Sequence, residues 1–172
     1  TKVLYEKELQ YMILTGSMGK DGTVAIGSRA NDAQSMLTVY NTKAEEVFVW
    51  KCAKENIISC DVSDNGKYFA VSVLGVNNGS VYSRVHVFNK NDNTPKATFE
   101  YADSAISSVQ FLSNETLFVQ FSMTEPSKAL AATPATDVPA AHFPVIVQTS
   151  PSVPTVRFLT VPLRAPKIPA AS

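Results

Sequence analysis

The sequence has few charged residues and no excess of either sign. Charged side chains make up 17% of its 172 residues, and 15 basic residues balance 15 acidic ones. An average soluble domain has a charged share of about 25%. Without clustered Lys and Arg the chain lacks the electrostatic footprint of a nucleic-acid or anionic-membrane binder. We therefore expect no nucleic-acid partner.

The sequence also has little cysteine. Its two cysteines, Cys52 and Cys60, are too few for a disulfide framework and lack the spacing of a four-ligand zinc site. We expect both to be buried thiols. A single bridge between them stays open, although the strands assigned below place them at the end of an outer strand and in the next inner strand, which disfavours a bond.

Long hydrophobic runs are absent as well. No apolar run approaches the roughly 18 residues that a membrane-spanning helix needs. The first residues, Thr1 to Glu6, lack the apolar core of a signal peptide. We expect a soluble chain with no membrane span.

Proline and glycine divide the chain into two parts. Only Pro95 of the ten prolines lies before residue 124, and all seven glycines lie at or before Gly79. Frequent proline fixes φ and removes backbone donors, which excludes regular helix and favours extended structure. We expect residues 1–123 to form strands with glycine-bearing turns, and residues 124–172 to form a Pro/Ala/Ser/Thr-rich extended tail.

The tail is not uniformly polar. Residues 143–147 and 153–163 are rich in Val, Ile, Leu and Phe. Apolar segments of this length can dock on the edge of a sheet. We expect these two segments to form short edge strands, so the tail is not expected to be fully disordered.

The first part of the chain contains an internal repeat. A shift of 49 residues aligns 57–70 with 106–119, so that apolar residues meet apolar residues and Asn65 meets Asn114. A shift of 44 residues brings 13–25 onto the same frame. The unit therefore occurs three times, with Ile13, Ile57 and Ile106 in equivalent first strands.

Each unit has the pattern of a four-stranded antiparallel sheet. In the best copy the pair Asn65-Gly66 predicts a type I′ turn between the first two strands, because both central residues of that turn need positive φ. The third and fourth strands are expected at 84–88 and 97–101, with counterparts at 36–40 and 47–50. Four short strands every 44 to 49 residues are typical of a propeller blade.

The stretch 63–71, Ser-Asp-Asn-Gly-Lys-Tyr-Phe-Ala-Val, followed by Val-His-Val-Phe at 85–88, resembles a blade of a WD-repeat-type β-propeller. No Gly-His opens a unit and no Trp-Asp closes a third strand. The chain is thus more similar to divergent bacterial propellers, which include membrane-anchored Gram-positive families of unknown function. The resemblance covers residues 10–121. It implies an all-β fold of blade-like sheets, a partial β-propeller, and an extracytoplasmic place in a bacterial envelope.

Two blades and the first hairpin of a third are fewer than the roughly four that close a ring. Open blades expose apolar faces and strand edges, which something must cover. The cover is the tail, another copy of the chain, or blades that are missing because the chain is a piece of a longer protein. We favour the last of these.

No motif in the sequence clearly indicates catalysis, phosphate binding or metal binding. Gly16 to Lys20 is similar to a phosphate-binding loop, but it lacks the first glycine and runs into a strand. Residues 89–93 have the oxygen spacing of a calcium loop with a single acid. His86 and His142 have no partners at metal-ligand or catalytic spacing, and we expect His86 to be a strand residue. We expect no catalytic, cofactor or metal site.

The best candidate for binding is the segment 75–80, Gly-Val-Asn-Asn-Gly-Ser, which is long for a loop within a blade. Long loops on rigid scaffolds are where binding residues concentrate. We therefore expect Asn77, Asn78 and the adjacent Tyr82 to contact a ligand. Four other aromatic residues are expected to pack between sheets instead: Phe48, Trp50, Phe99 and Tyr101.

These observations favour a non-enzymatic module that binds a protein or an envelope component through propeller loops. Two alternatives stay open. One is a structural or assembly subunit that self-associates through strand edges and the tail. The other is an inactive fragment of a propeller enzyme.

Overall fold

The computed structural model describes residues 6–123, 133–134, 145–148 and 156–159, and these residues contain strands and turns but no helix. Ten strands precede residue 124 and three short ones follow it. They are β1 (Ile13–Met18), β2 (Val24–Ser28), β3 (Ser35–Tyr40), β4 (Glu46–Cys52), β5 (Asn56–Val62), β6 (Tyr68–Asn77), β7 (Ser80–Asn89), β8 (Asp92–Ala102), β9 (Ala105–Ser113), β10 (Thr116–Met123), β11 (Thr133–Pro134), β12 (Val145–Gln148) and β13 (Val156–Leu159).

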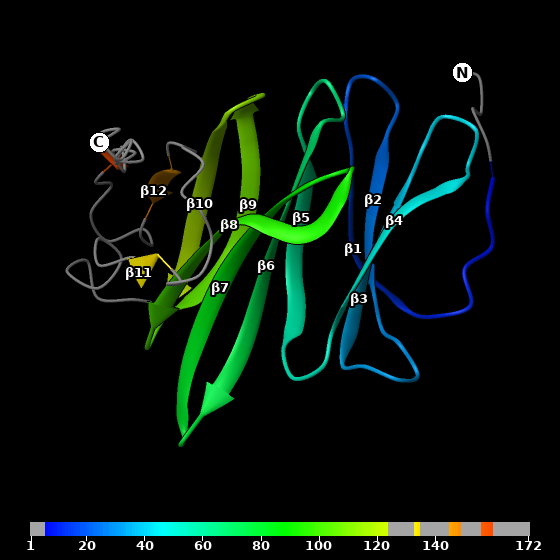
Figure 1. Cartoon of the computed structure of the whole chain (residues 1–172). Helices are drawn as coiled ribbons and strands as arrows, with labels where there is room; N and C mark the ends of the chain where they lie inside the picture. Colours follow the sequence, from blue (N-terminus) through cyan, green and yellow to red (C-terminus); the bar gives the residue numbers. More distant parts are fainter. Residues whose placement is uncertain (1–5, 124–132, 135–144, 149–155, 160–172) are drawn as a thin grey trace, which may run out of the picture.

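The strands form three sheets that lie side by side in chain order (Figure 1). Sheet A has the order β1-β2-β3-β4, and sheet B has the order β5-β6-β7-β8 with β11 beyond β8. Sheet C has the order β9-β10-β12-β13. Every pair within sheets A and B is antiparallel, as are β9–β10 and β12–β13. The predicted all-β fold of antiparallel four-stranded sheets is confirmed.

Two short strands form in the tail where the sequence predicts them. β12 overlaps the segment 143–147, and β13 lies within 153–163. β13 is the edge of sheet C, whereas β12 lies between β13 and β10. β11, which pairs with β8, is a two-residue strand that the sequence analysis did not predict. The other residues of the predicted extended tail lie outside the described residues.

Apolar side chains fill the two spaces between the sheets. Between A and B the core includes Leu37, Val39 and Phe48 on one side and Phe69, Val71 and Phe88 on the other. Between B and C it includes Val85, Val87, Phe99, Tyr101, Leu117, Val119 and Phe121. The aromatic rings contact one another across both spaces, with 5.2 Å between the centroids of Trp50 and Phe88 and 5.0 Å between those of Tyr101 and Phe121. The predicted packing role of these aromatic residues is confirmed.

The internal repeat is present, with a one-residue offset in its second strand. The first strands β1, β5 and β9 are equivalent, as predicted. In the second strand, however, Phe69 corresponds to Leu117 and not to Phe118, because Leu117 is the residue that faces the preceding sheet. Six residues separate the paired Val62 and Phe69, but five separate the paired Phe111 and Leu117. Since a one-residue slip exchanges the two faces of a strand, the predicted alignment of this strand is wrong.

The turn between β5 and β6 is not of type I′. Gly66 has φ of 63°, but Asn65 is not among the described residues with positive φ. The Gly66 amide donates to the Ser63 carbonyl at 2.8 Å, and the Asn65 side-chain oxygen accepts from the Lys67 amide at 3.1 Å. The connection is longer than the two-residue loop that a type I′ turn closes, so a single left-handed glycine is enough.

The type I′ geometry occurs instead at Asn78-Gly79. Their φ angles are 49° and 83°, and the flanking residues Asn77 and Ser80 pair directly. The predicted long loop at 75–80 is therefore wrong. β6 and β7 continue through it as a ladder and leave a two-residue turn, so this hairpin extends beyond the ends of the neighbouring strands (Figure 1).

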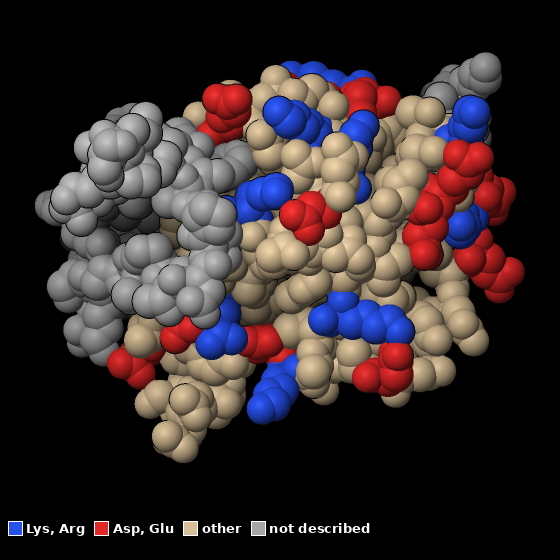
Figure 2. Space-filling model, viewed as in Figure 1, with Lys and Arg blue, Asp and Glu red and all other residues tan. Residues whose placement is uncertain are grey.

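Both cysteines are free and buried, so the expectation of buried thiols is confirmed. Charged side chains of both signs are interspersed on the surface seen in Figure 2, with several acidic ones near the N-terminus. Basic residues form no extended patch on that face.

Candidate functional site

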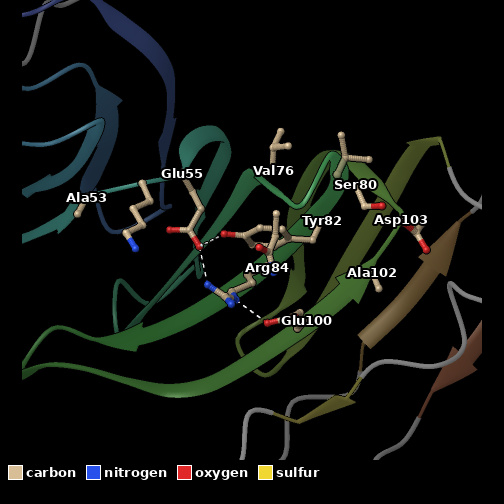
Figure 3. Close-up of a pocket in the computed structure, with 12 residues that line it drawn as sticks. Ala53, Glu55, Val76, Ser80, Tyr82, Arg84, Glu100, Ala102 and Asp103 are labelled. Atoms are coloured by element: carbon tan, nitrogen blue, oxygen red, sulfur yellow. Dashed lines mark hydrogen bonds and ion pairs between the residues drawn. The ribbon is translucent and has the colours of Figure 1, made fainter.

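A polar pocket of about 620 Å³ lies beside the β6–β7 hairpin (Figure 3). Three segments supply its walls: the β4–β5 connection, the outer part of the hairpin and the end of β8. The lining residues are Ala53, Lys54, Glu55, Val76, Asn77, Ser80, Val81, Tyr82, Arg84, Glu100, Ala102 and Asp103. Five of these carry charge, which is a large share in a chain with so few charged residues.

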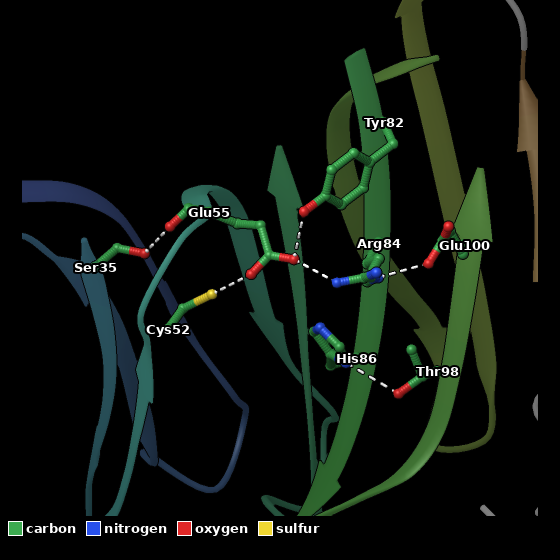
Figure 4. Close-up of polar contacts among 8 residues, drawn as sticks. All are labelled: Ser35, Cys52, Glu55, Tyr82, Arg84, His86, Thr98 and Glu100. Atoms are coloured by element: carbon green, nitrogen blue, oxygen red, sulfur yellow. Dashed lines mark hydrogen bonds and ion pairs between the residues drawn. The ribbon is translucent and has the colours of Figure 1, made fainter. Parts of the chain in front are cut away.

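Glu55 is the central residue of the pocket wall (Figure 4). It is 7% exposed, and its carboxylate accepts from three side chains that come from two sheets. The Cys52 thiol lies 2.7 Å from Oε2, while the Tyr82 hydroxyl and Arg84 Nη1 lie 3.0 and 2.5 Å from Oε1. Because buried carboxylates are costly unless paired and hydrogen-bonded, this set of donors is what keeps Glu55 ionised in place.

Burial alone would raise the pKa of Glu55. The hydrogen bonds from Cys52 and Tyr82 and the charge of Arg84 outweigh burial and hold the pKa of this carboxyl below its ordinary value of 4.5. The pKa of the Cys52 thiol moves the other way: burial, reinforced by Glu55, raises it to about 11. At neutral pH Cys52 is thus a thiol that donates to a carboxylate, not a thiolate nucleophile.

Arg84 lies between two carboxylates. Its Nη1 contacts Glu55 and its Nε lies 2.7 Å from Glu100 Oε2. Burial would lower the pKa of Arg84, but Glu100 and Glu55 together raise it. The guanidinium also lies over the ring of Tyr82, 4.8 Å from its centroid. Two ion pairs and a stacked ring fix this side chain at the wall of the pocket.

Tyr82 depends on a glycine opposite it. Gly75 pairs with Tyr82 across the β6–β7 ladder, and a Cβ on Gly75 would lie 2.4 Å from Cζ of the Tyr82 ring. The ring therefore covers the backbone of Gly75, with its hydroxyl directed at Glu55. A side chain at position 75 would remove the space that the ring occupies.

His86 lies behind the pocket wall and is not part of the lining. It is 9% exposed, its Nδ1 lies 2.9 Å from Thr98 Oγ1, and its ring centroid is 5.1 Å from that of Trp50. Burial lowers its pKa to about 4, with Glu55 opposing and Arg84 adding to the shift. The expectation that His86 packs within a strand is confirmed.

The same serine device joins each sheet to the next. Ser35 Oγ donates to the Glu55 carbonyl at 2.9 Å and accepts from the Ile57 amide at 3.2 Å. Ser83 Oγ does the same at the following junction, donating to the Ser104 carbonyl at 2.9 Å and accepting from the Ile106 amide at 3.1 Å.

Glu55 and Ser104 are therefore equivalent positions, and the fold requires only a backbone carbonyl there. The carboxylate of Glu55 is an addition to the repeat. The pocket is thus a specialised feature of the A–B junction.

The structure places two of the three predicted site residues at the pocket. Asn77 is exposed and lines it, and Tyr82 lines it with its hydroxyl already engaged by Glu55. Asn78 occupies the exposed turn at the tip of the hairpin and is not among the lining residues. A binding role for Asn77, Asn78 and Tyr82 stays a prediction.

Sequence reasoning missed Glu55, Arg84 and Glu100. The signal for Glu55 is its alignment with Ser104, since a charge replaces a small residue at one repeat position. Arg84 and Glu100 are directly opposed across the β7–β8 ladder, and opposite charges in neighbouring apolar strands are the corresponding signal.

Neither a metal site nor a membrane span is found in the part of the chain that the structure describes. No group of three or more His, Cys, Asp or Glu side chains there is placed to hold an ion. Within the same residues, no helix has the length and apolar character needed to cross a bilayer.

The sheets and the pocket define an all-β protein of repeated four-stranded antiparallel sheets with a preorganised polar site at one junction. The chain belongs to a family of unknown function, DUF5711, whose model matches residues 1–122. That match includes β1 to β9, all but the last residue of β10 and all the pocket residues, and it stops before β11, β12 and β13. No curated protein matches the chain.

Proposed function

We propose that the protein is a non-enzymatic binding module, built from blades of the β-propeller type, that binds a segment of a partner protein at the pocket beside the β6–β7 hairpin. One observation carries the proposal. Glu55, Tyr82 and Arg84 are fixed by contacts from two sheets, so the pocket wall is ordered before any ligand arrives. Preorganised polar groups in a concave site are what a specific binding surface requires.

The blade assignment is supported by the way the first strands meet. β1 packs on β5, and β5 packs on β9. Asp61 of β5 accepts from Ser17 of β1 and from the Phe111 amide of β9. First strands that line a common axis, with the later strands of each sheet radiating outward, are typical of propeller blades.

A binding role is supported over catalysis by the protonation states at the pocket. Burial raises the pKa of Cys52 to about 11, which disfavours a thiolate nucleophile. The described residues contain one histidine, His86. It is buried behind the wall, its pKa is lowered to about 4, and its side chain is hydrogen-bonded to Thr98. Acid–base and nucleophilic catalysis need groups poised near the working pH and open to substrate.

The chemistry of the lining indicates the partner. The lining contains two basic residues, Lys54 and Arg84, and three acidic ones, Glu55, Glu100 and Asp103, which gives the pocket a net charge of −1. Next to it Val76, at the hairpin tip, is 68% exposed. A polypeptide segment that carries a basic side chain and an apolar neighbour matches this combination.

Site-specific photo-crosslinking in cells that make the protein tests this proposal. A photoreactive residue at Val76 should give an adduct with a partner protein, whereas the same residue at Leu112 should not. Leu112 is a matched control because it is also an exposed apolar residue, 53% exposed, but lies on β9.

A second pair of variants places a tryptophan either inside the pocket or away from it. Ser80→Trp, within the lining, should reduce the Val76 adduct at least tenfold, while Glu115→Trp, in the exposed β9–β10 turn, should leave it unchanged. Equal adducts from the two crosslinking positions, or an adduct that Ser80→Trp does not reduce, would contradict the proposed site.

A further inference from the structure

Sheet C departs from the order that sheets A and B share. In both of these the second strand pairs antiparallel with the third, β2 with β3 and β6 with β7. In sheet C the second strand is β10, and β12 lies in the third position but runs parallel to β10. The edge of β10 is therefore occupied by a strand of the opposite direction to the one that the repeat places there.

β10 has the buried character of an inner strand. Leu117, Val119 and Phe121 are at most 1% exposed and pack against sheet B. They are the equivalents of Phe69, Val71 and Val73 in β6, which is paired on both of its edges. A strand of this kind needs a neighbour on both sides because its backbone groups are costly to leave unpaired.

The strand that covers this edge is a short one. β12 pairs with β10 over four residues, Leu117–Gln120 with Val145–Gln148, whereas β7 pairs with β6 over its whole length. Parallel pairs are also slightly less stable per residue than antiparallel ones. The family model matches residues 1–122, which include nearly all of β10, whereas β12 lies beyond the match.

We propose that the outer edge of β10 is a strand-acceptor site, with β12 as a displaceable cover, and that its partner is an extended protein segment that pairs antiparallel. The two complete sheets indicate the side chain that the segment carries. Phe88 is opposite Phe69 in sheet B, and Tyr40 is opposite Val24 in sheet A. The bound segment therefore places an aromatic residue opposite Leu117, and its main chain completes the ladder by β-strand addition.

A synthetic peptide with the sequence of residues 83–89, Ser-Arg-Val-His-Val-Phe-Asn, serves as the probe, because it is the chain's own third strand. The 172-residue chain should bind it, and hydrogen exchange at 145–148 and 156–159 should become faster as β12 is displaced. A control peptide with proline in place of its two valines cannot complete the ladder and should bind at least tenfold more weakly.

Two variants of the full chain test whether the peptide and β12 use the same edge. Val119 and Val147 are register partners, so a Val119→Cys, Val147→Cys disulfide locks the cover. The oxidised form should bind the peptide at least tenfold more weakly than its reduced form. Val147→Pro weakens the cover and should tighten binding by roughly tenfold, because more of the protein is then competent to bind.

Each remaining outcome overturns the proposal. Equal binding by the oxidised and reduced forms would place the peptide elsewhere on the protein. Absence of binding even to Val147→Pro would show that β10 accepts no antiparallel strand. Because the peptide site lies on sheet C, these results are independent of the crosslinking at Val76.

Discussion

The two junctions between sheets use the same framework but carry different side chains. At the A–B junction, Ser35 links the sheets, and the buried Glu55 adds a network with the buried Cys52 and the half-buried Tyr82 and Arg84. At the B–C junction Ser83 makes the equivalent link, and the counterpart of Glu55 is Ser104, which bonds locally to the Ala102 carbonyl.

The comparison distinguishes the serine contacts that join the sheets at both junctions from the charged side chains that occur at the A–B junction. Both junctions need a hydroxyl that satisfies one backbone carbonyl and one backbone amide. Only the A–B junction adds a carboxylate, a guanidinium and a histidine close together. Buried ion pairs are weak evidence for stability, because replacing them with apolar residues of similar shape is often neutral or stabilising. The network is therefore better explained by the proposed role in recognition than by a contribution to stability.

The largest expected effect is on the shared framework. Ser35→Ala and Ser83→Ala should each lower the free energy of unfolding by about 3 kcal/mol, because each leaves two buried backbone groups without their partner. Urea denaturation of both variants checks this. Ser107→Ala, which removes an exposed hydroxyl bond to the Gln120 carbonyl, is the control and should lose about 0.5 kcal/mol or less. A clear inequality between the two buried serines would mean that the junctions do not share this device.

The second effect concerns pH and belongs to the A–B junction. The folded pKa of His86 is about 4, below the value of 6.5 expected in the unfolded chain. As pH falls from 6.5 the unfolded chain takes up a proton first, so stability is lost between pH 6.5 and 4, by about 2–3 kcal/mol. Glu55, whose pKa is also depressed, adds a further loss only as the pH falls below 4.5.

His86→Gln should therefore flatten the loss of stability between pH 6.5 and 5, measured by urea denaturation across that range. Glutamine keeps a neutral hydrogen-bonding group near Thr98 but does not titrate. His142→Gln is the matched control, because it removes the only other histidine. A slope that survives in His86→Gln would show that the buried histidine is not its source.

Much of the fold could be predicted from the sequence because it depends on local patterns. Alternating apolar residues and turn residues give the strands, and the recurrence of Ile13, Ile57 and Ile106 gives the equivalence of the first strands. The offset in the second strands could not be predicted from the sequence. The connection before Phe69 has one more residue than the connection before Leu117, so a different set of residues faces the preceding sheet. Apolar residues still align with apolar residues in either register, and the sequence therefore gives no sign of the difference.

The site was harder to predict because it is assembled from residues far apart in the chain. Asn77, Asn78 and Tyr82 were predicted from a loop that proved to be a hairpin; two of them line the pocket, and a binding role for all three stays a prediction. Glu55 lies in a short connection without any motif. Its importance depends on side chains that reach it from β4 and β7, and such contacts become visible only when the two sheets are stacked.

A smaller effect is expected where the hairpin supports the A–B pocket. Gly75→Ala should lower the free energy of unfolding by about 1–2 kcal/mol, because its Cβ would force the Tyr82 ring away from Glu55 and Arg84. Chemical denaturation measures the loss. Gly16→Ala in β1 is the control, since its Cβ would meet only the Ala25 carbonyl, at 3.5 Å, and should be neutral or slightly stabilising. Equal results for the two glycines would mean that Tyr82 is free to relocate.

The smallest effect compares one tyrosine from each junction. Tyr82→Phe removes a hydroxyl that donates to the buried Glu55, so it should lower the free energy of unfolding by about 1 kcal/mol. The Tyr101 hydroxyl is buried without a partner among the described residues, and Tyr101→Phe should be neutral or stabilising by up to about 1 kcal/mol. Thermal and urea unfolding of both variants give the signs. Because the same atom is removed each time, opposite signs would show that the A–B junction alone is built around a polar network, and equal signs would remove that distinction.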